Sequence, residues 1–112
     1  MLTIQQISVK KTDILGTPGS GSILHSFVVQ MITRPKMEAY RVAIRWTPDG
    51  WRTTYQTEAG LASGESLDQD MWDTTISSFS TYNTSITFHY ALVAVGPNGL
   101  VWDNNNGWNY TI

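Results

Sequence analysis

Cysteine is absent from this chain of 112 residues. Disulfide bonds, thiolate nucleophiles and cysteine-based zinc sites are therefore excluded. Charge is also scarce, because only 14% of the residues are charged, against ~25% in a typical domain. The 7 Lys and Arg residues form no run and the net charge is -2. This balance excludes a basic patch for nucleic acid and a polybasic membrane anchor.

Long apolar segments are missing as well. No stretch approaches the ~18 residues of a membrane-spanning helix, and the N-terminus lacks the basic and apolar regions of a secretory signal. The 2 histidines, His25 and His89, are too few and too scattered for a metal site. No serine lies in a Gly-x-Ser-x-Gly elbow, which argues against a nucleophilic triad. We therefore expect neither a metal ion nor a cofactor.

The length of the chain indicates a single domain, and its aromatic content indicates a class of ligand. A chain of this length buries roughly 65% of its unfolded surface, so it can hold a core without disulfides. The sequence has no internal repeat and no domain boundary, and we expect residues 1–112 to form one monomeric domain. The 5 Trp and 5 Tyr residues are many for this length. Together with little charge and much Asn, Ser and Thr, they favour a neutral, polar ligand.

The clearest strand pattern covers residues 39–46. Arg41 and Arg45 take one face, and an apolar face is formed by Tyr40, Val42, Ile44 and Trp46. Alternation with a period of two is typical of a half-buried strand. The next four residues, 47–50, have the Pro and Gly of a turn. Trp46 should therefore continue the inward face, whereas Trp51 should project from the turn, where burial is harder.

Similar patterns predict the rest of the fold. Further strands are expected over residues 4–11, 23–32, 52–57, 71–77, 85–95, 100–102 and 108–112. Loops are expected over residues 16–22, 58–70 and 78–84, and a hairpin turn over residues 96–99. The inward faces should hold Phe27, Val29, Met31, Trp72, Ile86, Phe88, Tyr90 and Leu92. Seven to eight short strands without a helix predict an all-β fold, an immunoglobulin-like antiparallel β-sandwich.

Residues 101–112 carry the strongest indication of function. Trp102 and Trp108 stand there among an acid, Asp103, and the asparagines at 104, 105, 106 and 109. Indole rings are flat and apolar, and asparagine amides donate and accept hydrogen bonds without charge. This combination suits a flat, uncharged, hydroxyl-rich ligand, which is a sugar. The alternative is a terminal strand whose aromatic side chains only complete the core.

Two segments of the chain carry a resemblance to a known family. The first runs from Lys36 through the strand and turn to Trp51, and the second runs from Val101 to Tyr110. They resemble carbohydrate-binding module family 21, the starch-binding domains of fungal glucoamylase and the glycogen-targeting domains of protein phosphatase 1 regulatory subunits. The starch-binding families 25 and 53 share a similar Trp-Asp-x-Asn ending.

The resemblance implies a sandwich that binds α-1,4-glucans (starch, glycogen, maltooligosaccharides and cyclodextrins) without cutting them. In the family, one site uses a Trp after the turn, which matches Trp51, and an aromatic residue that matches Trp102. Two asparagines of that site match Asn104 and Asn109. The implied partner is a polysaccharide, with a catalytic domain elsewhere in a parent protein. The location would be extracellular for a secreted amylolytic enzyme and cytoplasmic for a glycogen-targeting protein.

Three further residues have open roles. The family's third aromatic residue matches Tyr90 if the hairpin insertion is shortest, but alternation turns Tyr90 inward and leaves His89 outside. We favour the alternation argument and keep both as candidates. Asp103 is counted with the site and is expected to order the asparagine loop by local hydrogen bonds. Trp108 replaces a small or polar family residue, and it either extends the aromatic surface or packs over the strand.

The chain also departs from the family. The region of the family's second sugar site, around residues 36–38, has no aromatic ring, so a second site is not expected. Residues 41–44 only superficially resemble a phosphatase-docking motif and lack its Phe. Asp49 and Asp103 lie near the aromatic residues and are the candidates for the carboxylate pair of a glycosidase. Both have simpler roles in loops, so we expect no enzyme activity. The competing function is that of an immunoglobulin- or fibronectin-like protein-interaction domain.

Overall fold

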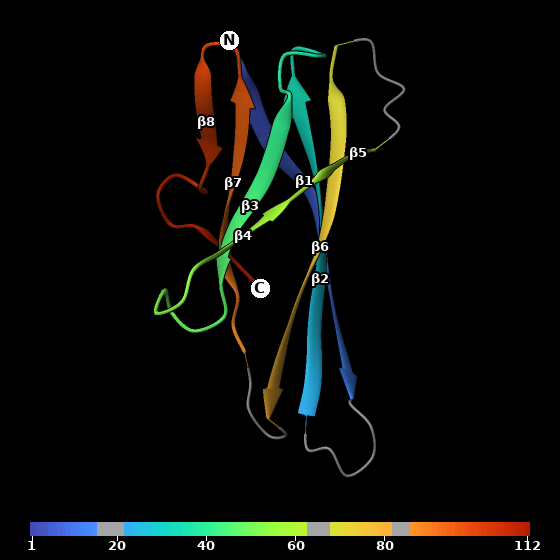
Figure 1. Ribbon diagram of the computed structural model, residues 1–112, viewed down its shortest axis with the longest axis vertical. Coiled ribbons are helices and arrows are strands. Elements are labelled where there is room, and N and C mark those ends of the chain that lie inside the picture. Colours follow the sequence, from blue (N-terminus) through green and yellow to red (C-terminus); the bar gives the residue numbers. More distant parts are fainter. Residues whose placement is uncertain (16–21, 63–67, 82–85) are drawn as a thin grey trace.

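The computed structural model describes residues 1–15, 22–62, 68–81 and 86–112 (Figure 1). These residues form the strands β1 (Thr3–Leu15), β2 (Ser22–Arg34), β3 (Arg41–Thr47), β4 (Tyr55–Glu58), β5 (Gly60–Ala62), β6 (Asp70–Thr81), β7 (His89–Gly96), β8 (Gly99–Asp103) and β9 (Tyr110–Thr111). In this part of the chain, no helix is long and apolar enough to cross a membrane.

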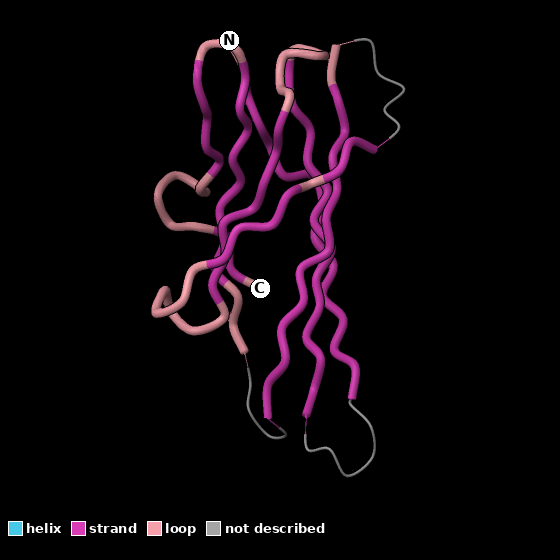
Figure 2. Tube along the Cα trace, viewed as in Figure 1, coloured by secondary structure: helices cyan, strands magenta, loops and turns pink. Residues whose placement is uncertain are grey.

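The strands form two antiparallel sheets that pack face to face (Figure 2). The first sheet has the order β1-β2-β6-β5, and the second has the order β4-β3-β7-β8, with β9 also pairing with β7. This is the strand order of an immunoglobulin-like sandwich, in which the first, second, fifth and fourth strands of the motif face the third, sixth and seventh. The predicted fold class is therefore confirmed.

Several strand boundaries differ from those expected. The short strand β5 lies inside the predicted loop 58–70, and β6 continues to Thr81, although residues 78–84 were expected to be a loop. The Ser- and Thr-rich end of β6 pairs with β2 as far as Ser22, so tertiary pairing outweighs the local polarity of this segment. The predicted loop residues 16–21, 63–67 and 82–84 lie outside the described residues.

The region around β3 also corrects two expectations. Tyr40, predicted to face inward, is exposed, because the strand begins only at Arg41 and the alternation does not extend into the preceding bend. The returning strand begins at Tyr55 rather than at residue 52, since the turn after Thr47 is longer than four residues. Near the C-terminus, only residues 110 and 111 of the predicted strand 108–112 are strand, and Trp108 lies in a turn.

The core lies between the two sheets and follows the predicted alternation. The buried side chains of this core include Phe27, Val29, Met31, Val42, Ile44, Trp46, Trp72, Phe88, Tyr90 and Leu92. Both buried indoles find a partner for their N–H group, as a buried Trp must. Trp46 Nε1 donates to Thr57 Oγ1 at 2.9 Å, and Trp72 Nε1 donates to Thr33 Oγ1 at 2.9 Å.

A row of four aromatic rings crosses the inner face of the second sheet. Trp46 pairs with Tyr55 on β4 and with Tyr90 on β7, which pairs in turn with Tyr110 on β9. The rings of Trp46 and Tyr55 stack at 4.7 Å, and those of Tyr90 and Tyr110 stack at 5.3 Å. Stacked aromatic pairs stabilise beyond their buried area. The row therefore fixes the strand ends from which the candidate site is built.

Candidate functional site

Two loops lie toward one end of the second sheet, a region that we call the loop end (Figure 1). One follows Thr47 at the end of β3 and carries Trp51, and the other comprises residues 104–109 between β8 and β9. Thr47 pairs with His89 on β7, and His89 pairs with Thr111 on β9. Because neighbouring strands lie 4.7–4.9 Å apart, Thr47 and Thr111 are separated by about 10 Å, and the 104–109 loop rejoins the sheet at Tyr110, one residue before Thr111. The fold thus places the end of β3 two strands away from β9, although about half the chain lies between the two loops in sequence.

The β3–β4 turn is organised by Thr47, whose side chain is buried. Its Oγ1 accepts hydrogen bonds from the backbone N–H groups of Trp51 at 3.0 Å and Asp49 at 3.3 Å. Gly50 and Trp51 have φ angles of 70° and 72°, in the left-handed region. Such a conformation is costly for a bulky residue and persists only where its surroundings hold it. The turn therefore holds Trp51 in place, with 39% of the residue exposed.

Asp49 connects the two sides of this turn by hydrogen bonds. Its Oδ1 accepts hydrogen bonds from the Thr47 hydroxyl at 2.8 Å and from the backbone N–H of Thr53 at 2.9 Å. The hydrogen bond from Thr53 is the main reason that the pKa of Asp49 is lowered. A carboxylate that stays ionised and bonded to its own turn is a poor general acid. This arrangement supports the structural role expected of Asp49.

The 104–109 loop bulges out of the edge of the second sheet. Asp103 pairs with Leu92 and Tyr110 pairs with Tyr90, so β8 and β9 run along the same strand on either side of the loop. The backbone N–H of Asn109 donates to the carbonyl of Asn104 at 2.7 Å and closes the loop. Three asparagines of the segment have left-handed φ angles: Asn105 (55°), Asn106 (59°) and Asn109 (59°). Asn is enriched in this conformation, so backbone geometry explains part of the asparagine content.

The amide side chains of the loop divide into two groups. Asn105 Nδ2 donates to the Asn109 carbonyl at 3.2 Å, and Asn104 Oδ1 accepts from the Gly107 N–H at 3.0 Å. Within the described residues, the Asn104 Nδ2 group and the whole Asn109 carboxamide have no protein partner. These two residues are the ones that the resemblance assigns to ligand binding, and both retain hydrogen-bonding capacity.

Asp103 ties the loop to both sheets. Its Oδ2 accepts hydrogen bonds from the Tyr110 hydroxyl at 2.6 Å and from the Gln6 N–H at 3.3 Å, and its Oδ1 accepts from the Asn105 N–H at 3.3 Å. The register of β1 shifts between Gln6 and Ser8, which frees the Gln6 N–H for this bond. Burial, then the hydrogen bond and charge of Asp103, raise the pKa of Tyr110. The carboxylate therefore positions the loop from inside.

Trp102 lies on the outer face of β8, with 43% of the residue exposed. Its cross-strand partner Val93 points to the same outer face and yet is only 5% exposed. Since Trp102 is the large side chain beside Val93, we infer that the indole lies against the sheet and covers it. One face of the ring then remains open to water. This is the arrangement that a stacking surface requires.

His89 and Tyr90 point to opposite faces of β7, as successive strand residues do. Tyr90 is buried, and its hydroxyl donates to Gln6 Oε1 at 2.5 Å. Burial raises the pKa of Tyr90 to about 12. His89 is half-buried and lies 3.2 Å from Thr111 Oγ1 through its Nδ1. Of the two sequence alternatives, His89 is the one on the outer face of the sheet, and the Tyr90 ring is covered by the core.

Trp108 does not pack over the strand. It is 83% exposed, and its backbone N–H donates to the Asn105 carbonyl at 3.2 Å.

The sequence analysis missed Tyr55, a half-exposed ring at the β4 edge that stacks on Trp46. The period-two spacing of Tyr55 and Thr57, which both lie beside β3, was the signal that could have placed it.

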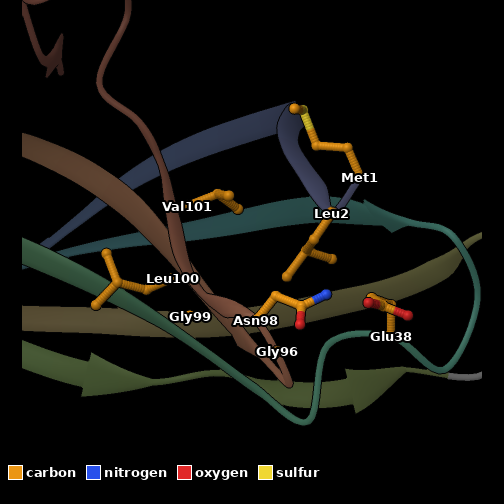
Figure 3. A pocket seen from close by; sticks show the side chains of 8 residues that line it. All are labelled: Met1, Leu2, Glu38, Gly96, Asn98, Gly99, Leu100 and Val101. Carbon is orange, nitrogen blue, oxygen red and sulfur yellow. The ribbon is translucent and has the colours of Figure 1, made fainter.

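Two cavities lie away from the loops. One of about 370 Å³ sits between the N-terminus and the β7–β8 hairpin and is lined by Leu2, Glu38 and Leu100, among others (Figure 3). The other, of about 390 Å³, is lined by Met37, Tyr40, Leu61 and Trp72, among others. Neither contains a residue of the two loops. Among the described residues, no three His, Cys, Asp or Glu side chains lie close enough to hold a metal ion.

In sequence, no protein-family model and no curated protein matches this chain. In three dimensions, the chain is similar to the solution structure of the carbohydrate binding module of the muscle glycogen-targeting subunit of Protein Phosphatase-1. The TM-score is 0.59 over 96% of this chain and 73% of that chain, at 23% sequence identity. The two proteins therefore share a β-sandwich fold, and the resemblance read from the sequence is confirmed at that level.

Proposed function

We propose that this chain is a non-catalytic carbohydrate-binding module that binds α-1,4-glucans at the loop end of its second sheet. One observation carries the proposal. Two half-exposed indoles belong to one sheet: Trp51 follows the end of β3, and Trp102 lies on β8 directly before the loop in which Asn104 and Asn109 keep unpaired amide groups. We call this set, together with His89, the aromatic surface.

The chemistry of a glucose ring fits the aromatic surface. The ring presents C–H bonds on its faces and hydroxyl groups around its rim. A sugar face that leaves water against an indole contributes roughly 25 cal/mol per Å² of apolar area. The rim hydroxyls must keep hydrogen bonds or this gain is cancelled, and Asn104 and Asn109 can supply them. Asp103 and Asp49 serve as positioning residues, because their carboxylates are occupied by the loops.

The ligand class within carbohydrates follows from the resemblance and from the glycogen-targeting neighbour in fold. Starch, glycogen, maltooligosaccharides and cyclodextrins are the expected ligands. An open surface buries little area, so each contact should be weak, and avidity on a polymer should strengthen it. A monomer attached to a catalytic domain in a parent protein would use the surface in this way.

The test is calorimetric titration with β-cyclodextrin and maltoheptaose, with cellohexaose as the control sugar. We expect micromolar-to-millimolar binding of the two α-glucans only. Trp51→Ala and Trp102→Ala should each weaken that binding by at least about tenfold, or ~1.4 kcal/mol, while both variants remain folded in thermal melting. Leu61→Ala, an exposed apolar side chain beside the distant cavity, is the matched control and should bind like the parent.

Two outcomes would count against the proposal. If no α-glucan binds, the exposed indoles are structural or face another protein, and the protein-interaction function takes precedence. If α-glucans bind but both Trp variants bind as tightly as the parent, the function stands and the aromatic surface is the wrong site.

A further inference from the structure

Trp108 is the most exposed of the tryptophans, at 83%. Its indole makes few packing contacts, so it contributes little to the stability of the folded domain. An exposed indole leaves a large apolar area in water. The side chain is therefore unexplained by the stability of the sandwich.

The backbone does not explain Trp108 either. The left-handed positions of the loop are filled by Asn105, Asn106, Gly107 and Asn109, and Trp108 is not one of them. A small or polar residue would form the same turn, which needs only the hydrogen bond from the backbone N–H of Trp108 to the Asn105 carbonyl.

The loop nevertheless holds Trp108 in a defined place. The backbone bonds from Gly107 and Asn109 to the Asn104 carbonyl, at 3.2 and 2.7 Å, close the loop on both sides of Trp108. The side chains of Asp103 and Asn105 add bonds to the same loop. A ring displayed on a pre-ordered loop loses less backbone freedom on binding than one on a loose segment.

Trp108 also lies close to the aromatic surface. Two peptide bonds link Trp102 to Asn104, one hydrogen bond links Asn104 to Asn109, and Asn109 follows Trp108. These links limit the separation of the Trp102 and Trp108 Cα atoms to no more than about 18 Å. The free carboxamide of Asn109 stands next to Trp108 in the chain. One oligosaccharide of moderate length can therefore reach both indoles.

We propose that Trp108 is a third stacking ring, which lengthens the aromatic surface and makes the domain prefer longer α-glucan chains over short ones. This inference rests on the function proposed above. A short oligosaccharide contacts Trp51 and Trp102 only, whereas a longer one also covers Trp108.

The experiment is a titration of the parent and of Trp108→Ala with maltotriose, maltopentaose and maltoheptaose. In the parent, affinity should rise with chain length. Trp108→Ala should leave maltotriose binding unchanged and weaken maltoheptaose binding by about five- to tenfold, which flattens the dependence on length. Trp108→Phe, which keeps a ring, should restore part of that dependence. Thermal melting of both variants should match the parent, because the side chain is exposed.

Trp102→Ala serves as the contrasting control, since it should weaken binding at every length. If the parent and Trp108→Ala show the same affinities at all three lengths, the third ring is rejected while the proposed function stands. If the parent binds none of the three oligosaccharides, the proposed function and this inference fail together.

Discussion

Tryptophan is used in two regions of this sandwich under different physical constraints. Between the sheets, Trp46 and Trp72 are buried, and each indole N–H donates to a threonine hydroxyl. At the loop end of the second sheet, Trp51, Trp102 and Trp108 are exposed. In the described residues, none of these three indole N–H groups has a protein partner.

The difference distinguishes the indoles that stabilise the folded domain from those that are exposed on its surface. A buried indole must be hydrogen-bonded, and its removal leaves a cavity. An indole exposed on a loop or on the outer face of a strand contributes less to the core, and its N–H and one or both ring faces remain open to water. Mutations in the inner region should therefore affect stability, and those in the outer region should affect binding. The predictions below test this division, in order of decreasing effect.

Trp46→Ala should produce the largest effect. The substitution removes the ring that stacks on Tyr55 and contacts Phe88 at a centroid distance of 5.9 Å. We expect a loss of ~3–5 kcal/mol in the free energy of unfolding, measured by urea denaturation. Trp102→Ala, the matched change on the outer face, should cost less, ~1–2 kcal/mol, because it uncovers Val93 but leaves no cavity in the core. Equal losses in the two variants would remove the distinction between the regions.

Alkaline pH should act on the inner region through Tyr90. Burial raises the pKa of its hydroxyl from 10 to about 12, so above pH 10 the unfolded chain releases a proton that the folded chain retains. The stabilising contribution is complete below pH 10 and is lost as the pH rises through 12, by roughly 2 kcal/mol.

Denaturation on both sides of pH 10 measures this loss. Tyr90→Phe should reduce the slope of stability against pH, at a cost of about 1 kcal/mol for the lost bond to Gln6. Tyr40→Phe, a change on an exposed ring, should leave the slope as it is. A parent whose stability stays flat above pH 10 would contradict the burial of the Tyr90 hydroxyl.

Asn109→Gly should have the smallest effect on stability and still affect the ligand. Glycine accepts the φ angle of 59° without strain, so the free energy of unfolding should change by less than ~0.5 kcal/mol. Loss of the free carboxamide should weaken maltoheptaose binding severalfold in calorimetry. Asn106→Gly makes the same change at the same φ angle and should leave binding unaffected. If both variants lose affinity equally, the asparagines act through loop geometry alone.

Most of the fold was predictable from the sequence because local alternation and burial agree in the central strands. The inward positions of β2 and β7 and the turn after Thr47 follow from this agreement. The prediction failed where pairing between distant segments decides the structure. The polar end of β6 becomes strand because β2 lies beside it, and Tyr40 turns outward because the strand begins two residues later than predicted, at Arg41.

The candidate site was predictable in its residue types and only partly in their roles. Composition and resemblance pointed to Trp51, Trp102, Asn104 and Asn109. They did not reveal that Asp103 faces inward to Tyr110, because that bond depends on the sheet register. Nor could they reveal left-handed backbone as a reason for the asparagines, since φ angles depend on how the loop closes.

The sequence by itself determined that this chain is a low-charge, cysteine-free β-sandwich with an excess of indole and amide groups, because alternation and composition are local properties. Only the tertiary structure decided which rings are covered and which are displayed. It placed His89 outward and Tyr90 inward, and it set the end of β3 two strands away from β9. The physical reason is that exposure and proximity arise from packing two sheets together, and no local pattern contains that information.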